Sequence, residues 1–511
     1  MLTHPPALAG SPGPGVNSGV SAPRAKLGPA GSTVVRNFAS LLIGRMGSQV
    51  MSFLTNAYLA RRIAPAGFGA VGLAQSIISY LGLLSDSGLS VIALRDGAQD
   101  PSGLDGLIRS ITGLRLALSC ALVPVGLLAA QFLPFSESSL NVLRVFVLSL
   151  PLQALAVDWV FRALQRMHYA AITQLATAAL TLLLTIAFVH NPRHLGRVPW
   201  LGVATGAAAV ALSLCLLGRT GHRLSVSFQF SRSKRYLAQS LPLCAASFAI
   251  TLYIQANFLI LGKVHGDTEV GMYAAASKIA TVVFTITSLY FSAMAPALME
   301  LSARSSRDAA RLLAESVRVT GAGACGLVAI GTAASGSILR WVFGAPFLPA
   351  TNALAILLCS GGVVAVTSNW GQLAIACHRE RLVLWATALG GVVNLIACAA
   401  LVRRYGSLGA AIGNLAAEVV VGAVVIPPWP REVGLGALRS SVTPAIVAAV
   451  ALCLGSRLAP LGGLWAASAV ACLYVAGLWA TRTVTMNDIN RVRSALQAQG
   501  LERCRTFSTQ P

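Results

Sequence analysis

Apolar stretches of about 20 residues recur along this chain, from Val34 to Trp479. A stretch of that length crosses the hydrocarbon core of a membrane as an α-helix. The composition agrees, because only 11% of the residues are charged, whereas average soluble domains carry about 25%. The mean hydropathy is +0.72. These features predict an all-α polytopic membrane protein.

We expect about fourteen transmembrane helices in the 511 residues. In chain order, the expected spans are about 35–59, 69–93, 108–132, 140–160, 170–190, 200–218, 238–261, 270–298, 319–340, 351–376, 382–402, 407–426, 441–457 and 461–481. The longest basic connection, Arg219 to Arg235, follows the sixth span and is interpreted as the linker between two six-helix bundles.

The two ends of the chain differ from the apolar part between them. Residues 1–33 are rich in Pro, Gly, Ser and Ala, which predicts a disordered tail without a cleavable signal peptide. The predicted domains are a cytoplasmic tail at 1–33, an N-terminal bundle at 34–218, a linker at 219–237, a C-terminal bundle at 238–426, two additional transmembrane helices at 427–481 and a cytoplasmic tail at 482–511.

The net charge of +22 would suggest a nucleic-acid partner in a soluble protein. Here the Lys and Arg residues lie mainly in the short connections between spans, where such residues set membrane topology. Placing the N-terminus inside puts most of them on the cytoplasmic side. We therefore expect both termini to be cytoplasmic, and no nucleic acid to bind.

An internal repeat supports the division into two bundles. Residues 69–77 (GAVGLAQSI) align with residues 271–279 (GMYAAASKI). Each copy follows a short polar turn, at 64–67 in the first half and at 266–269 in the second. Two repeated halves in parallel order imply a central cavity and alternating access.

Polar side chains recur at helical spacing in four of the expected spans. Lipid cannot satisfy such polar faces, so we expect them to turn inward. The cavity candidates are Arg45, Gln49 and Asn56 in the first span, Gln75 and Asp86 in the second, Gln255 in the seventh, and Lys278, Thr281 and Thr285 in the eighth.

Two of these candidates are cations, Arg45 and Lys278, and a cation inside a membrane span is costly enough to indicate a functional site. Asp86 either ends a span or neutralises one of the two cations. The hydroxyl residues have a simpler alternative, which is to bond a neighbouring helix. Fixed cations attract an anion such as pyrophosphate, and amides and hydroxyls bind sugars. A pyrophosphate-linked glycolipid meets both requirements.

Sequence motifs for catalysis or metal binding are missing. The chain has no GxxxxGK[ST], HExxH or GxSxG, and its ten cysteines form no CxxC. We therefore expect a transporter with no catalytic residue, metal or cofactor.

Several short stretches, in order, resemble the oligosaccharide flippases, which are the Wzx-like polysaccharide exporters of the multidrug/oligosaccharidyl-lipid/polysaccharide (MOP) superfamily. The resemblance covers about residues 34–426 and rests on Arg36-Asn37-Phe38, Pro65 to Gly69, Asp86 to Leu89, Gly266 to Lys278, Trp341 to Phe347, and Asn394 with Tyr405 to Gly413.

This resemblance implies two pseudo-repeated, MATE-like six-helix bundles around a central cationic cavity, plus two C-terminal helices. It implies translocation of polyprenyl-pyrophosphate-linked oligosaccharide repeat units across the bacterial inner membrane, for exopolysaccharide, O-antigen or capsule biosynthesis. The implied partners are this lipid-linked substrate, membrane lipids, and a polysaccharide polymerase with its export machinery.

Four alternatives stay open. A cation-coupled multidrug antiporter would need a cavity dominated by carboxylates, and a lipid II flippase would use the same chemistry as an oligosaccharide flippase. A membrane glycosyltransferase or polymerase would need a large extramembrane loop, which the expected spans leave no room for. A scaffold without transport is the remaining alternative.

Overall fold

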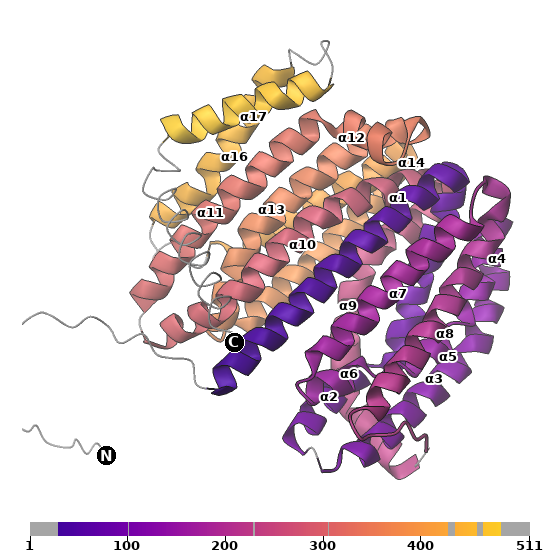
Figure 1. Cartoon of the computed structure of the whole chain (residues 1–511). Coiled ribbons are helices and arrows are strands. Elements are labelled where there is room, and N and C mark those ends of the chain that lie inside the picture. Colours follow the sequence, from indigo (N-terminus) through magenta and orange to yellow (C-terminus); the bar gives the residue numbers. More distant parts are fainter. Residues whose placement is uncertain are drawn as a thin grey trace, which may run out of the picture.

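The computed structural model describes residues 29–100, 102–227, 230–304, 306–427, 435–456 and 463–481, which form helices joined by short connections (Figure 1). This described part contains no β-strand. The first helix begins at Pro29, inside the segment predicted as a tail, and both the rest of that tail and the predicted tail at 482–511 lie outside the described residues.

The helices form two series along the chain. The first series is α1 (Pro29–Asp86), α2 (Leu89–Gln99), α3 (Leu104–Phe132), α4 (Glu137–Val147), α5 (Leu150–Ala154), α6 (Asp158–Ala163), α7 (Met167–Phe188), the 3-10 helix η1 (Pro192–Gly196) and α8 (Arg197–Gly218). The second is α9 (Phe230–His265), α10 (Asp267–Arg304), α11 (Ser306–Ala333), α12 (Ser335–Val342), the 3-10 helix η2 (Ala345–Ala350), α13 (Thr351–Ala376), α14 (Glu380–Val425), α16 (Leu435–Ser456) and α17 (Gly463–Ala480).

Within the described residues, nine helices are long and apolar enough to cross a membrane. Two shorter apolar helices, Val442–Gly455 and Trp465–Ala480, lie in the C-terminal part. The chain is thus a multi-pass helical membrane protein, as the composition predicts. The expected number of fourteen crossings stays a prediction.

Helices α1 and α14 are each longer than one crossing needs and are interrupted by one non-helical residue. Ala64 in α1 has φ 60° and ψ 172°, and it precedes Pro65, whose ring disfavours helical geometry in the residue before it. Gly406 in α14 has φ 54°, and a Cβ there would lie 2.6 Å from Oε2 of Glu269. The helical segments on either side of these residues correspond to expected spans one and two, and eleven and twelve.

The fourth expected span is broken into α4, α5 and α6. The first break precedes Pro151, which stands at the start of α5, where its missing N–H costs nothing. The second break, after Ala154, separates α5 from α6. Each break leaves backbone carbonyl groups without a partner in the helix, so side chains or water must satisfy them.

The connection between α9 and α10 is tighter than the sequence predicts. Of the expected four-residue turn at 266–269, only Gly266 lies outside a helix, with φ 76°. Glycine adopts this left-handed conformation without strain and so ends α9 abruptly. Asp267 and Glu269 belong to the first turn of α10, where carboxylates interact favourably with the positive end of the helix dipole.

The two series meet where α1 crosses α10, and Figure 1 shows α1 lying between α7 and α10. The crossing is close, because a Cβ on Gly69 would lie 1.7 Å from the carbonyl oxygen of Asp267. A Cβ on Gly271 would lie 2.0 Å from that of Pro65. Gly69 aligns with Gly271 in the sequence repeat, and Pro65 falls opposite Asp267 in the same alignment. The two repeat copies therefore contact each other reciprocally.

Candidate substrate cavity

A cavity of about 350 Å³ lies beside the crossing of α1 and α10, and we call it the interface cavity. Its polar lining residues are Asn56, Gln75, Ser76, Ser79, Gln255 and Lys278. The fold thus brings together four of the cavity candidates, which come from three helices and four expected spans. They are Asn56, Gln75, Gln255 and Lys278.

Lys278 supplies the positive charge of the interface cavity. Among the described residues, no carboxylate lines it and Lys278 forms no ion pair. Gln255 donates a long hydrogen bond of 3.4 Å from its amide to the hydroxyl of Ser79, which links α9 to α1. The cavity therefore presents one cation surrounded by neutral amides and hydroxyls.

A second cavity of about 600 Å³ adjoins the first, and we call it the α7 cavity because a row of α7 side chains lines it. The two cavities share the lining residues Asn56, Gln75 and Phe146. The remaining lining comes from α1, the broken helix α4 to α6, and α8. Sequence reasoning missed the row of Thr173, Thr177, Thr181 and Thr185, although its four-residue spacing is visible in the sequence.

The other candidates on α1 and α10 line neither cavity. Arg45 and Gln49 are exposed. Thr281 is exposed as well, and its hydroxyl donates to the carbonyl of Ser277 at 2.7 Å. Thr285 donates in the same way to Thr281 at 2.9 Å.

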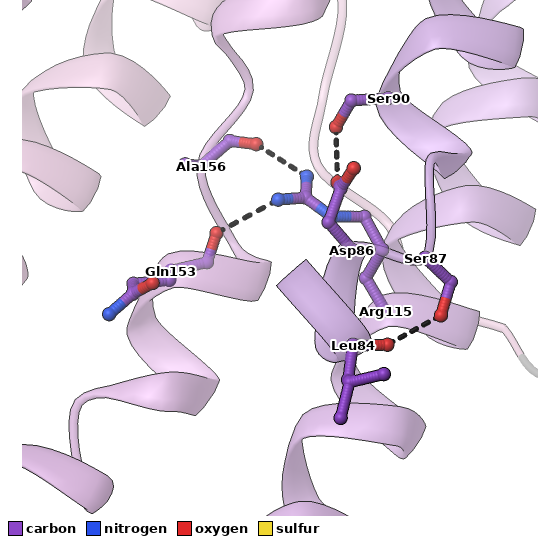
Figure 2. A network of polar contacts seen from close by, with 7 residues as sticks. All are labelled: Leu84, Asp86, Ser87, Ser90, Arg115, Gln153 and Ala156. Carbon is purple, nitrogen blue, oxygen red and sulfur yellow. Dashed lines mark hydrogen bonds and ion pairs between the residues drawn. The ribbon is translucent and has the colours of Figure 1, made fainter. Parts of the chain in front are cut away.

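Asp86 is paired with a cation that lies on α3 (Figure 2). Nε of Arg115 lies 3.1 Å from the Asp86 carboxylate. The guanidinium also donates to the carbonyl oxygens of Ala156 at 3.0 Å and Gln153 at 3.1 Å, and the hydroxyl of Ser90 donates to Asp86. Asp86 therefore neutralises neither of the cations proposed for it from the sequence.

This pair has a structural consequence for the α7 cavity. Arg115 bonds two carbonyl oxygens at the break between α5 and α6, those of Ala156 and Gln153. The Gln153 oxygen also accepts from the backbone N–H of Ala156 at 3.2 Å. The broken segment can then place Gln153 and Asp158 on the cavity wall. Arg115 is buried, with 9% of its side chain exposed, so it does not reach a membrane surface.

Polar contacts join the two helix series beyond the interface cavity, toward the α9–α10 turn. There the Asp267 carboxylate accepts hydrogen bonds from the hydroxyls of Ser139, at 2.6 Å, and Ser136. The guanidinium of Arg61 donates to the carbonyl oxygens of Val342, at 2.8 Å, and Trp341. These contacts join the first helix series to the second, and none of their residues lines the cavity.

Comparison with curated proteins places this architecture among transporters. A putative O-antigen transporter of Escherichia coli (strain K12) is 20% identical over 398 residues, which is 76% of this chain and 95% of that protein. The succinoglycan biosynthesis transport protein ExoT of Rhizobium meliloti (strain 1021) is 24% identical over 255 residues, which is 49% of this chain and 50% of that protein.

Two solved structures show the same fold. The lipid II flippase MurJ in an inward closed conformation has a TM-score of 0.67 at 11% identity, covering 87% of this chain and 99% of that one. An inward-facing multidrug resistance transporter of the MATE family, in the MOP superfamily, has a TM-score of 0.59 at 14% identity, covering 80% and 98%. The expected fold class, a MATE-like helical membrane protein, is therefore confirmed.

The family assignment rests on a separate match. The model of a family described as polysaccharide biosynthesis protein matches residues 34–302, which is more than half of this 511-residue chain. The chain therefore belongs to the polysaccharide biosynthesis protein family.

Proposed function

We propose that this protein is a transporter that moves polyprenyl-pyrophosphate-linked oligosaccharide units across a membrane by alternating access. The observation that carries the proposal is the interface cavity, where Lys278 stands among amides and hydroxyls and the described lining residues include no carboxylate. The names of relatives agree, since they include an O-antigen transporter and a succinoglycan transport protein.

Placing the Lys278 ammonium inside a membrane span costs free energy. A lysine ammonium inside a membrane span is expensive unless a counter-charge meets it. A pyrophosphate supplies that charge, and the compact ammonium group is a common partner of phosphate oxygens. The prenyl chain of the same ligand is as apolar as membrane lipid, so it stays between the helices or in the bilayer.

Transport then requires the two predicted bundles, 34–218 and 238–426, to open alternately on either side of this cavity. The contacts of Arg61 and Asp267 join the two helix series at one end, which positive-inside reasoning assigns to the outer side. In this proposal the protein lies in the bacterial inner membrane with both termini cytoplasmic. It passes its substrate to the outer leaflet, where a polysaccharide polymerase and export machinery use it.

The multidrug antiporter is the main rival because a multidrug resistance transporter has the same fold. A cationic drug would be repelled by Lys278 unless a carboxylate stood beside it. The α7 cavity contains one carboxylate among its described lining residues, Asp158, and this group interacts electrostatically with Arg162 and Arg115. The interface cavity therefore favours an anionic ligand over a cationic one.

Reconstituted translocation tests the proposal. Purified protein in liposomes is given a fluorescent polyprenyl-pyrophosphate oligosaccharide, and the wild type is compared with Lys278→Met and with Lys263→Met, whose lysine is exposed and lines neither cavity. We expect Lys278→Met to slow translocation by about tenfold or more, as loss of a charged hydrogen bond predicts. Lys263→Met should match the wild type.

Two outcomes contradict the proposal. One is a folded, inserted Lys278→Met protein that translocates as fast as the wild type. The other is a wild type that leaves the glycolipid in place and exports an organic cation, which would identify an antiporter.

A further inference from the structure

The hydroxyl groups of the α7 cavity have a common bonding pattern. On α7, Thr173, Thr177 and Thr181 each donate to the carbonyl oxygen of the residue four positions earlier, at 3.0, 2.7 and 2.8 Å. A hydroxyl that donates its hydrogen to the backbone keeps lone pairs with which it can accept. The row therefore presents oxygen acceptors to the cavity.

The opposite walls follow the same pattern. The hydroxyls of Thr55 and Ser149 donate to backbone carbonyls at 2.9 and 2.7 Å. The amide of Asn56 donates to the carbonyl of Ser52 at 2.7 Å, which leaves its own oxygen as an acceptor. The amide of Gln153 donates to the Ser149 hydroxyl at 3.3 Å. Many of the donors in the cavity lining are thus used within the protein.

A wall of acceptors selects for a ligand rich in donors. A carbohydrate fits this requirement, because each of its hydroxyl groups carries an O–H that can donate. A pyrophosphate does not fit, because its ionised oxygens only accept. The neighbouring interface cavity has the opposite character, since the ammonium group of Lys278 is positively charged and donates hydrogen bonds. The volume of about 600 Å³ lies within the range of about 300–1,000 Å³ typical of sites for drug-sized ligands.

We propose that the α7 cavity is the glycan subsite of the transporter, in which the Thr173–Thr177–Thr181 row accepts hydrogen bonds from sugar hydroxyls while Lys278 holds the pyrophosphate. The shared lining residues Asn56 and Gln75 make the two subsites continuous, so one ligand spans both. This inference rests on the proposed function and adds to it the place and chemistry of sugar recognition.

The test separates the glycan from the pyrophosphate by using two probes. One is undecaprenyl pyrophosphate without sugar, and the other is the lipid-linked oligosaccharide fraction extracted from membranes of the cells that produce this protein. Each competes with a fluorescent prenyl pyrophosphate for the purified full-length protein in nanodiscs. The measured quantity is the preference, which is the affinity for the glycan-bearing probe divided by that for the bare probe.

The informative variant is Thr177→Val with Thr181→Val, which keeps side-chain shape and removes two acceptor oxygens. The matched control is Thr387→Val on α14, whose hydroxyl donates to the carbonyl of Val383 at 2.9 Å and lines neither cavity. We expect the double variant to lower the preference by about tenfold, as loss of two hydrogen bonds predicts. Its affinity for the bare probe, which also reports folding, should stay at the wild-type value.

The other outcomes overturn the inference in distinguishable ways. If the double variant keeps the wild-type preference, or loses affinity for both probes equally, the α7 row does not recognise sugar. The same follows if the variant alters only a sodium dependence of binding, because acceptor oxygens also bind cations. If the wild type binds neither probe, the proposed function itself fails.

Discussion

At the scale of single residues, we expect the pairing of Asp86 with Arg115 to contribute most to the free energy of unfolding. Their side chains are 27% and 9% exposed, and no other ion pair given for the described residues is so enclosed. Arg115 cannot lose its proton in a protein. Its charge therefore depends on Asp86 and on the carbonyl groups that it contacts.

Replacing Asp86 with Asn should leave the Arg115 charge without a counter-ion. Removing one partner of a buried pair costs about 3–5 kcal/mol, so we expect a marked fall in the thermal unfolding midpoint of the detergent-solubilised protein. The control is Glu137→Gln, which breaks the exposed Arg144–Glu137 pair and should cost less than about 1 kcal/mol. Equal midpoints for the two variants would show that the buried pair is not stabilising.

The residues of the interface cavity were predictable because polar residues at helical spacing mark an inward face. Asn56, Gln75, Gln255 and Lys278 follow from that spacing alone. The partner of Asp86 was not predictable, because Arg115 lies on another helix and only tertiary packing brings the two together. Arg45 shares a helical face with Asn56 but lies about three turns from it, and it lines neither cavity although Ser48, three residues along, lines the α7 cavity.

At the scale of helices, the crossing of α1 and α10 depends on two glycines. Gly69 and Gly271 let the two backbones approach so closely that any Cβ would overlap a carbonyl oxygen. Small residues serve helix packing in membranes in this way. Because the crossing lies next to Gly72 and Ala274, which line the interface cavity, its geometry also shapes the site.

The variant Gly271→Ala should therefore disrupt the protein although alanine favours helices. Its Cβ would lie 2.0 Å from the Pro65 carbonyl oxygen, so the two helices must separate. Gly323→Ala on α11 is the control, because its Cβ would meet nothing within 4 Å. The control should be neutral or more stable by up to about 1 kcal/mol. A Gly271→Ala protein that unfolds at the same temperature as Gly323→Ala would contradict the close crossing.

The locations of the helices were easier to predict than their interruptions. Long apolar runs fix the membrane-crossing segments because lipid requires every backbone group to bond within the helix. The turn at Ala64 follows from Pro65, which the sequence shows. The second break in the fourth span has no comparable signal, and Arg115, which bonds the carbonyl oxygens of Ala156 and Gln153 there, comes from another helix. The α7 cavity, whose wall includes this broken segment, was therefore missed.

At the scale of the whole molecule, the two cavities differ in the chemical groups that they present to a ligand. The interface cavity offers a cation where the two helix series meet, and the α7 cavity offers acceptor oxygens within the first series. The contacts of Asp267 and Arg61 join the two helix series near the α9–α10 turn. A ligand with an anionic centre and a polyhydroxyl head matches this division.

The most direct test is a cryo-EM structure of the protein in nanodiscs with its lipid-linked oligosaccharide bound. We expect pyrophosphate oxygens within about 3 Å of the Lys278 ammonium nitrogen and sugar density against Thr177 and Thr181 of α7. Pyrophosphate bound elsewhere, with Lys278 paired to a protein carboxylate or facing only water, would contradict the central claim that this lysine is the anion site.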